Sequence, residues 1–104
     1  MIMVRTVFRT KWGKANAVVQ GMKEMMNRGA MSAEAQNQKA VLMTDLSGEF
    51  HTVVMEARFA SLAAFEEFRT RMFAGGGDES ENNQEVDELI LSGRQEFYTI
   101  EAEF

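Results

Sequence analysis

The sequence predicts an α+β domain in which one four-stranded antiparallel sheet carries its helices on a single face. Three observations predict it. Stretches that alternate apolar and polar residues, as half-buried strands do, are separated by stretches whose apolar residues recur every three or four positions, as in amphipathic helices. The 104 residues fit a single domain, residues 1–104. A composition of 45% hydrophobic and 26% charged residues is that of a folded globular chain.

The first strand and the first helix are predicted before residue 30. Residues 2–11 alternate and are rich in β-branched and aromatic side chains, which predicts a strand. From Lys14 the apolar residues take helical spacing, and we expect Gly29 to cap this helix and its methionines to fill the core. A polar connection with one helical turn from Ser32 should follow. The two faces of the strand are Val4, Thr6 and Phe8 on one side and Arg5, Val7 and Arg9 on the other.

A hairpin and a second helix are predicted in the middle of the chain. Residues 39–47 and 50–59 are predicted as two strands joined by a glycine-containing turn at residues 47–49. Ser61 is placed to cap the N-terminus of the next helix, because its hydroxyl can accept a hydrogen bond from a free backbone N–H. The apolar stripe of that helix consists of Leu62, Phe65, Phe68 and Met72.

The last third of the chain is predicted as a loop, a short helix and a fourth strand. Residues 75–84 are glycines, acids and amides, so we expect a flexible loop. Such a loop is either a lid over a pocket or, as we favour, a tolerated surface insertion. Residues 85–92 predict a short helix capped by Gly93, and residues 94–104 alternate as a strand.

This order of elements, βαββαβ, predicts a ferredoxin-like fold with spatial strand order 4-1-3-2 and one sheet face without helices. On the third strand Val53, Met55, Ala57 and Phe59 suit the helix-covered face. The opposite set is mixed: Phe50, Thr52, Val54, Glu56 and Arg58. Because a solvated sheet face is usually polar, this apolar content predicts that a partner covers it. The simplest partner is a second copy, packed sheet to sheet about a two-fold axis.

The chain resembles a known superfamily in its layout. The βαββαβ order, the block GEFHTVVMEARFASLAAFEEF at residues 48–68 and the closing GRQEFYTIE at residues 93–101 are similar to the dimeric α/β-barrel superfamily. This superfamily includes antibiotic-biosynthesis-monooxygenase-like (ABM-like) and NIPSNAP-like small proteins. The resemblance implies a sheet-to-sheet dimeric α/β barrel and, if the protein is an enzyme, cofactor-independent oxygenation by acid–base residues. Heme-degrading members use a histidine in a helix, whereas His51 falls on a predicted strand, so no cofactor is expected.

Charge and composition exclude several classes. The net charge of −5 disfavours nucleic acid and anionic membranes as partners. Residues 1–45 hold seven Lys or Arg against three Asp or Glu, whereas residues 46–104 hold four against thirteen. Such halves either pair within one domain, as we favour, or complement each other between subunits. Without cysteine there is no disulfide or thiolate metal site, and without an apolar leader or span we expect a cytoplasmic protein.

The candidate chemistry lies on the uncovered face. Arg5, Arg9, Glu56 and Arg58 belong to neighbouring strands there, and Glu96 with Tyr98 joins them unless Phe97 and Thr99 face that side instead. One interpretation, which we favour, is an ion-pair network that fixes the dimer. The other is a polar floor for a small anionic or phenolic ligand, with the arginines binding it, Tyr98 donating a hydrogen bond and Glu56 acting as general base if burial raises its pKa.

Two further residues are candidates. His51, the single histidine, is on the predicted third strand and is more often structural than catalytic in such a place. It has no second histidine or cysteine to complete a metal site, so none is expected. Trp12 either lines a pocket mouth between sheet and helix or plugs the strand end, the second being favoured.

The sequence therefore predicts a homodimer that binds a small organic, in particular aromatic, molecule between sheet and helices or in the barrel. A monooxygenase-like enzyme is one form of this hypothesis. The alternative is a non-catalytic structural or interaction module whose inner charges only hold the dimer together.

Overall fold

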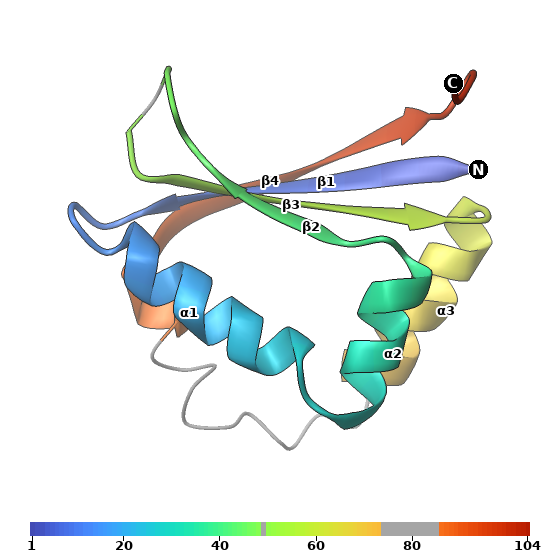
Figure 1. Cartoon of the computed structure of the whole chain (residues 1–104), viewed down its shortest axis with the longest axis horizontal. Helices are drawn as coiled ribbons and strands as arrows, with labels where there is room; N and C mark the ends of the chain where they lie inside the picture. Colours follow the sequence, from blue (N-terminus) through green and yellow to red (C-terminus); the bar gives the residue numbers. More distant parts are fainter. Residues whose placement is uncertain (49, 74–85) are drawn as a thin grey trace.

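The computed structural model describes residues 1–48, 50–73 and 86–104. Glu49 of the predicted turn and the predicted loop at residues 75–84 lie outside the described residues. The elements, in chain order, are β1 (Ile2–Thr10), α1 (Ala15–Met26), α2 (Gly29–Asn37), β2 (Val41–Thr44), β3 (Thr52–Phe59), α3 (Leu62–Phe73) and β4 (Ile90–Thr99) (Figure 1). The predicted ferredoxin-like α+β class is confirmed.

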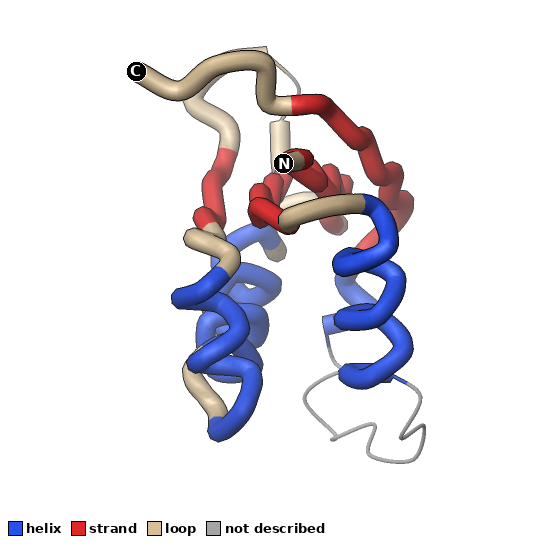
Figure 2. Tube along the Cα trace, turned by 90° about the vertical axis from the view of Figure 1, so that its right-hand side faces the viewer, coloured by secondary structure: helices blue, strands red, loops and turns tan. Residues whose placement is uncertain are grey.

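The four strands form one sheet in the order β2-β3-β1-β4, which is the predicted order 4-1-3-2. Every neighbouring pair is antiparallel. Helices α1, α2 and α3 lie on the same side of the sheet, and among the described residues no helix lies on the opposite side (Figures 1 and 2). The strands therefore have a helix-covered face and an uncovered face, named here the helix face and the open face.

The strand register assigns each side chain to one of these faces. Arg5 of β1 lies opposite Glu56 of β3 and opposite Glu96 of β4, so these three charges share the open face. Phe97, one residue along, packs its ring 5.4 Å from that of Phe65 of α3 and so belongs to the helix face. Tyr98 consequently points to the open face, which resolves the predicted ambiguity in the fourth strand.

The core lies between the helix face and the helices, as predicted. One cluster consists of Val4, Ala57, Phe59 and Phe65, and a second of Val18, Met22 and Val53. Ser61 caps α3 as predicted, since its Oγ accepts a hydrogen bond from the N–H of Ala64 at 3.1 Å.

The predicted polar connection after α1 is wrong, because α2 is a nine-residue helix. Its alanines, methionine, glutamate and glutamine favour helix, but they form no apolar stripe, so periodicity did not reveal it. Gly29 is not the cap of α1, which ends at Met26 with Asn27 as its C-cap. Gly29 instead begins α2 with a positive φ of 46°.

Several strand boundaries also differ from the predicted ones. β4 begins at Ile90, so Gly93 lies inside a strand opposite Phe8 rather than at a helix end. A Cβ at Gly93 would come within 3.2 Å of the Phe8 ring, so the glycine makes room for that ring. β2 is only four residues long, and β4 ends at Thr99. His51 precedes β3 with a left-handed φ of 60°, which lies outside the β region of backbone conformations.

Candidate functional site

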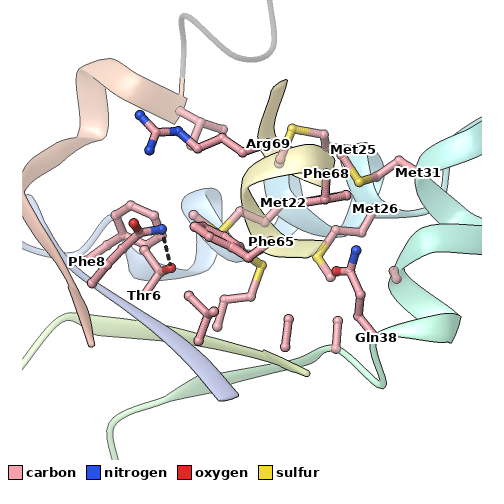
Figure 3. A pocket seen from close by; sticks show the side chains of 18 of the residues that line it. Thr6, Phe8, Met22, Met25, Met26, Met31, Gln38, Phe65, Phe68 and Arg69 are labelled. Atoms are coloured by element: carbon pink, nitrogen blue, oxygen red, sulfur yellow. Dashed lines mark hydrogen bonds between the residues drawn. The ribbon is translucent and has the colours of Figure 1, made fainter. Parts of the chain in front are cut away.

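A cavity of about 430 Å³ lies between the helix face and the helices (Figure 3). Its walls are mainly methionine and phenylalanine side chains from both layers. Figure 3 shows the methionine sulfurs and the rings of Phe65 and Phe68 turned toward this space. These side chains are Met22, Met25, Met26, Met31, Met55, Phe8, Phe59, Phe65 and Phe68. A cavity of this size and lining is typical of a small-molecule site.

The sequence leaves this space open because small residues face it. Three alanines line the cavity and contribute little side-chain volume: Ala35 of α2, Ala40 just before β2, and Ala57 of β3. Gly21 of α1 also lines it, and a Cβ there would overlap Cγ2 of Val86. Close approach of Val86 to α1 therefore requires glycine, and unbranched methionines adapt to the irregular space that remains.

Few polar groups reach the cavity. The amide of Gln95 donates a hydrogen bond to Oγ1 of Thr6 at 3.3 Å across β4 and β1. Gln38 is 8% exposed and lines the opposite end (Figure 3). Arg69 and Asp87 are exposed lining residues, and Arg69 forms an ion pair with Glu66 of the same helix at 3.9 Å.

The open face carries the second candidate site, a network of ion pairs and hydrogen bonds. Arg5 binds Glu56 through Nη2 at 2.6 Å and Nε at 2.7 Å, and its Nη1 lies 3.8 Å from Glu96. Glu96 also accepts hydrogen bonds from Arg94 Nε at 2.9 Å and from the Tyr98 hydroxyl at 2.8 Å. The guanidinium of Arg5 lies over the Tyr98 ring, 5.5 Å from its centre. These groups hold one another in place.

This network shifts three pKa values. The hydrogen bond to Glu56 raises the pKa of Arg5, so its charge is permanent. Hydrogen bonds from Arg94 and then from Tyr98 lower the pKa of Glu96. The hydrogen bond to Glu96 raises the pKa of Tyr98, which keeps the phenol protonated. The arrangement favours a charged, fixed Glu96 and a neutral Tyr98 that is already engaged as a donor.

The other open-face arginines lie away from this centre. Arg58 forms an ion pair with Glu103 of the C-terminal segment at 2.6 Å. Arg9 is exposed near the far end of β1, opposite Thr52 and Ser92. Arg5, Glu56, Glu96 and Tyr98 are therefore brought together as predicted, whereas Arg9 and Arg58 lie toward opposite ends of the face.

His51 and Trp12 form an aromatic group at the end of β1 and β3. Their ring centres are 4.5 Å apart, and the Phe50 ring lies 6.4 Å from each. The backbone carbonyl of His51 accepts hydrogen bonds from N–H and Oγ1 of the buried Thr10, at 2.9 and 3.2 Å. None of the hydrogen bonds among the described residues involves its imidazole. Neither residue lines the cavity, and Trp12 is 80% exposed.

The open face was predicted from the sequence, but the cavity residues were not assigned. Gln38, Met31 and Ala35 were missed because they belong to, or directly follow, α2, which was not recognised as a helix. The methionines of α1 were expected to fill the core; Met22 does so, whereas Met25 and Met26 are half-buried in the cavity wall. Within the described residues no group of three or more His, Cys, Asp or Glu could hold a metal ion, and no helix is long and apolar enough to cross a membrane.

These features define a ferredoxin-like α+β protein with a cavity beneath its sheet and a charged, partly apolar face above it. Solved structures share this fold. An uncharacterised NIPSNAP domain protein from Burkholderia xenovorans is 14% identical with a TM-score of 0.78, over 98% of this chain and 96% of that one. A dimeric ferredoxin-like protein from an uncultured marine organism is 10% identical with a TM-score of 0.69, over 99% and 90%.

A third similar structure is an antibiotic biosynthesis monooxygenase, 11% identical with a TM-score of 0.65, over 96% of this chain and 98% of that one. No family model matches the chain, and no curated protein matches it. The predicted resemblance to the ABM-like and NIPSNAP-like superfamily is confirmed at the level of the fold.

Proposed function

We propose that this protein binds a small, largely apolar molecule in the cavity between sheet and helices, and that it acts as a homodimer joined through the open faces. The cavity carries the first part of the proposal. Its roughly 430 Å³ fall within the range of ligand sites, and its methionine-rich wall can adapt to an aromatic or branched aliphatic shape.

We propose binding without assigning a reaction. One similar structure is described as an antibiotic biosynthesis monooxygenase, so oxygenation of an aromatic ligand is one form of this function. The predicted acid–base candidates Glu56, Tyr98 and His51 do not line the cavity, however. Catalysis there would have to use other groups, and the geometry supports binding more directly.

Methionine methyl NMR tests ligand binding, because the chain has nine methionines in distinct places. The probe is 2-naphthol, a small aromatic. We expect saturable shifts of the methyl signals of cavity-lining Met22, Met26 and Met55, with little change at Met3 and Met43 of the open face. An absence of saturable shifts at millimolar probe, or shifts confined to the open face, would contradict the proposal.

Two alanines of α2 give a matched pair of blocking variants. Ala35 lines the cavity, whereas Ala33 is exposed on the same helix. Ala35→Phe should fill part of the cavity and abolish binding, and Ala33→Phe should bind as the wild type does. Circular dichroism of both variants checks that the helix content is kept.

The open face supports the dimer. Beside its ion pairs it carries half-buried Met3, Met43 and Val54, together with exposed Val41 and Tyr98. A self-complementary face that mixes apolar residues with fixed charges suits a two-fold contact with a second copy. One similar structure is itself described as dimeric and ferredoxin-like. The non-catalytic assembly module remains the second candidate, because this face alone would suffice for it.

Sedimentation equilibrium tests the dimer. We expect a dimer at micromolar concentration and a monomer for Val54→Arg, which places a charge at the middle of the open face. Ala63→Arg adds the same charge on an exposed position of α3 and should remain dimeric. A wild-type chain that is monomeric at this concentration would exclude the homodimer while leaving ligand binding open.

A further inference from the structure

One buried polar group in the cavity wall has unused hydrogen-bonding capacity. Gln38 follows α2 as its C-cap and is 8% exposed, although it lines the cavity. Its backbone is held on both sides: its N–H donates to the carbonyl of Glu34 at 2.9 Å, and its carbonyl accepts the N–H of Arg58 at 2.8 Å. The side chain therefore starts from a point fixed between α2 and β3.

The orientation of the Gln38 carboxamide follows from its neighbours. Its Nε2 donates to Oε2 of Glu34 at 3.4 Å, and the other oxygen of Glu34 accepts a hydrogen bond from Arg71 of α3 at 2.7 Å. A carboxylate paired with an arginine only accepts hydrogen bonds, so the amide nitrogen must face Glu34. Oε1 is consequently turned away from Glu34, and Figure 3 shows the carboxamide beside Met26 in the cavity wall.

No hydrogen bond to Oε1 of Gln38 is found among the described residues. This oxygen keeps some accessible surface, because no fully buried side-chain nitrogen or oxygen atom of these residues lacks a hydrogen-bond partner. A donor that enters the cavity can therefore bind it in place of water. The methionine and phenylalanine side chains of the wall carry no strong donor. This oxygen is thus an acceptor at one end of a largely apolar cavity, whose other polar lining residues include Thr6, Gln95 and Arg69.

We propose that Gln38 is a specificity-determining residue whose Oε1 accepts a hydrogen bond from the ligand. The ligand is then a mostly apolar molecule that carries one uncharged O–H or N–H donor at the end nearest α2. A carboxylate or phosphate is disfavoured at that end, because Oε1 can only accept a hydrogen bond and the amide nitrogen is already engaged by Glu34. This inference rests on the proposed function, that the cavity binds a small molecule.

Isothermal titration with two ligands of similar size tests the inference. 2-Naphthol carries an O–H donor, and 2-methoxynaphthalene has the same ring system without it. The wild type should bind 2-naphthol about tenfold more tightly, the effect of one neutral hydrogen bond in a buried site. Gln38→Met, of similar length but without the acceptor, should bring 2-naphthol down to the affinity of 2-methoxynaphthalene and change the latter by less than about threefold.

A second pair of variants tests the orientation of the carboxamide. Glu34→Gln offers both a donor and an acceptor, so Gln38 can turn its nitrogen into the cavity, and the preference for 2-naphthol should fall severalfold. Glu101→Gln, an exposed change of the same kind in the C-terminal segment and away from the cavity, should keep the tenfold preference. Met26 methyl shifts confirm in each case that the ligand occupies the same end of the cavity.

The outcomes separate the two proposals. If neither compound binds the wild type, the proposed function fails and the inference fails with it. If both bind equally well, or if Gln38→Met keeps the tenfold preference, the cavity still binds small molecules but Gln38 does not select them. Equal binding would mean that the ligand makes no net favourable hydrogen bond to Oε1.

Discussion

The helix face and the open face of this sheet use neighbouring residues of the same strands for opposite purposes. Met55 faces a methionine-rich cavity, and Glu56, the next residue of β3, is held by Arg5 on the other side. On β4, Phe97 packs against Phe65 and Tyr98 bonds Glu96. The period of two thus places apolar and charged chemistry one residue apart but a full sheet thickness from each other.

This difference changes where function is sought. The charged residues that first suggest catalysis are tied to one another on the open face, which suits assembly. The space for a ligand lies on the helix face, among residues of ordinary core type. In this protein, therefore, the charged residues and the ligand cavity form two separate sites. We propose that the open face binds a second copy and that the cavity binds a small molecule.

The largest effect should come from the helix face. Phe65 is 7% exposed, and its ring contacts those of Phe59 and Phe97 at centre distances of 5.2 and 5.4 Å. Phe65→Ala should lower the free energy of unfolding by about 3–5 kcal/mol, because it removes buried area and enlarges an existing space. Urea unfolding at one fixed protein concentration measures this loss. A loss below about 1 kcal/mol would mean that the ring is not part of a packed core.

A smaller and more diagnostic effect is expected on the open face. Glu56 is 18% and Arg5 39% exposed in the single chain, so their ion pair stabilises the monomer by about 1 kcal/mol or less. If a second copy covers the face, Glu56→Gln leaves Arg5 buried without its partner, which is costly. We expect the dimer dissociation constant to rise at least tenfold while monomer stability changes little. If both the dimer dissociation constant and the monomer stability change only slightly, the open face stays solvated.

Acid should weaken the open face at Glu96. The pKa of Glu96 is lowered from its ordinary 4.5, first by the hydrogen bond from Arg94 and then by that from Tyr98. The contribution of Glu96 to folding stability is therefore fully present above pH 4.5. It is lost as the pH falls through the lowered pKa of Glu96 in the folded protein. Glu96→Gln should be less stable than the wild type at pH 6, and the two should converge toward pH 3. Thermal unfolding across this pH range measures the difference, and a constant gap would contradict the assignment.

The sequence predicted the sheet better than the cavity. Strand order and faces followed because alternation in β1, β3 and β4 is strong, and Ser61 carries a capping signal that acts locally. The boundaries of α2 and the left-handed conformation of His51 depend on packing against distant elements, which a local pattern does not record. The sequence pattern placed Arg5, Glu56, Glu96 and Tyr98 on the same face of the sheet. Which of these side chains bond one another became clear only from the structure.

The cavity could not be predicted for a related reason. The cavity exists because small side chains leave space between the sheet and the helices. In the sequence, Ala35, Ala57 and Gly21 carry no signal that they line such a space. Gln38 looks like an ordinary polar residue after a helix. Only the placement of Glu34 and Arg71 beside it shows which of its two polar atoms faces the cavity.

The smallest effect is a pKa shift, and it can be measured without interference because Tyr98 is the single tyrosine. The hydrogen bond to Glu96 and then burial raise its pKa above 10.0, whereas the positive charges of Arg5 and Arg94 lower it. The stabilisation from this hydrogen bond is present below pH 10.0 and disappears as the pH rises through the raised value. Tyrosinate absorbance should therefore appear above the ordinary range.

Two variants should move this titration in opposite directions. Glu96→Gln removes the negative charge that holds the phenol protonated, so the pKa of Tyr98 should fall back toward 10.0. Arg5→Met removes a positive charge that favours tyrosinate, so the pKa should rise further. Because neither change touches the helix face, 2-naphthol should bind both variants as it binds the wild type. A shift of the same sign in both would show that Tyr98 responds to loss of the dimer rather than to its two charged neighbours.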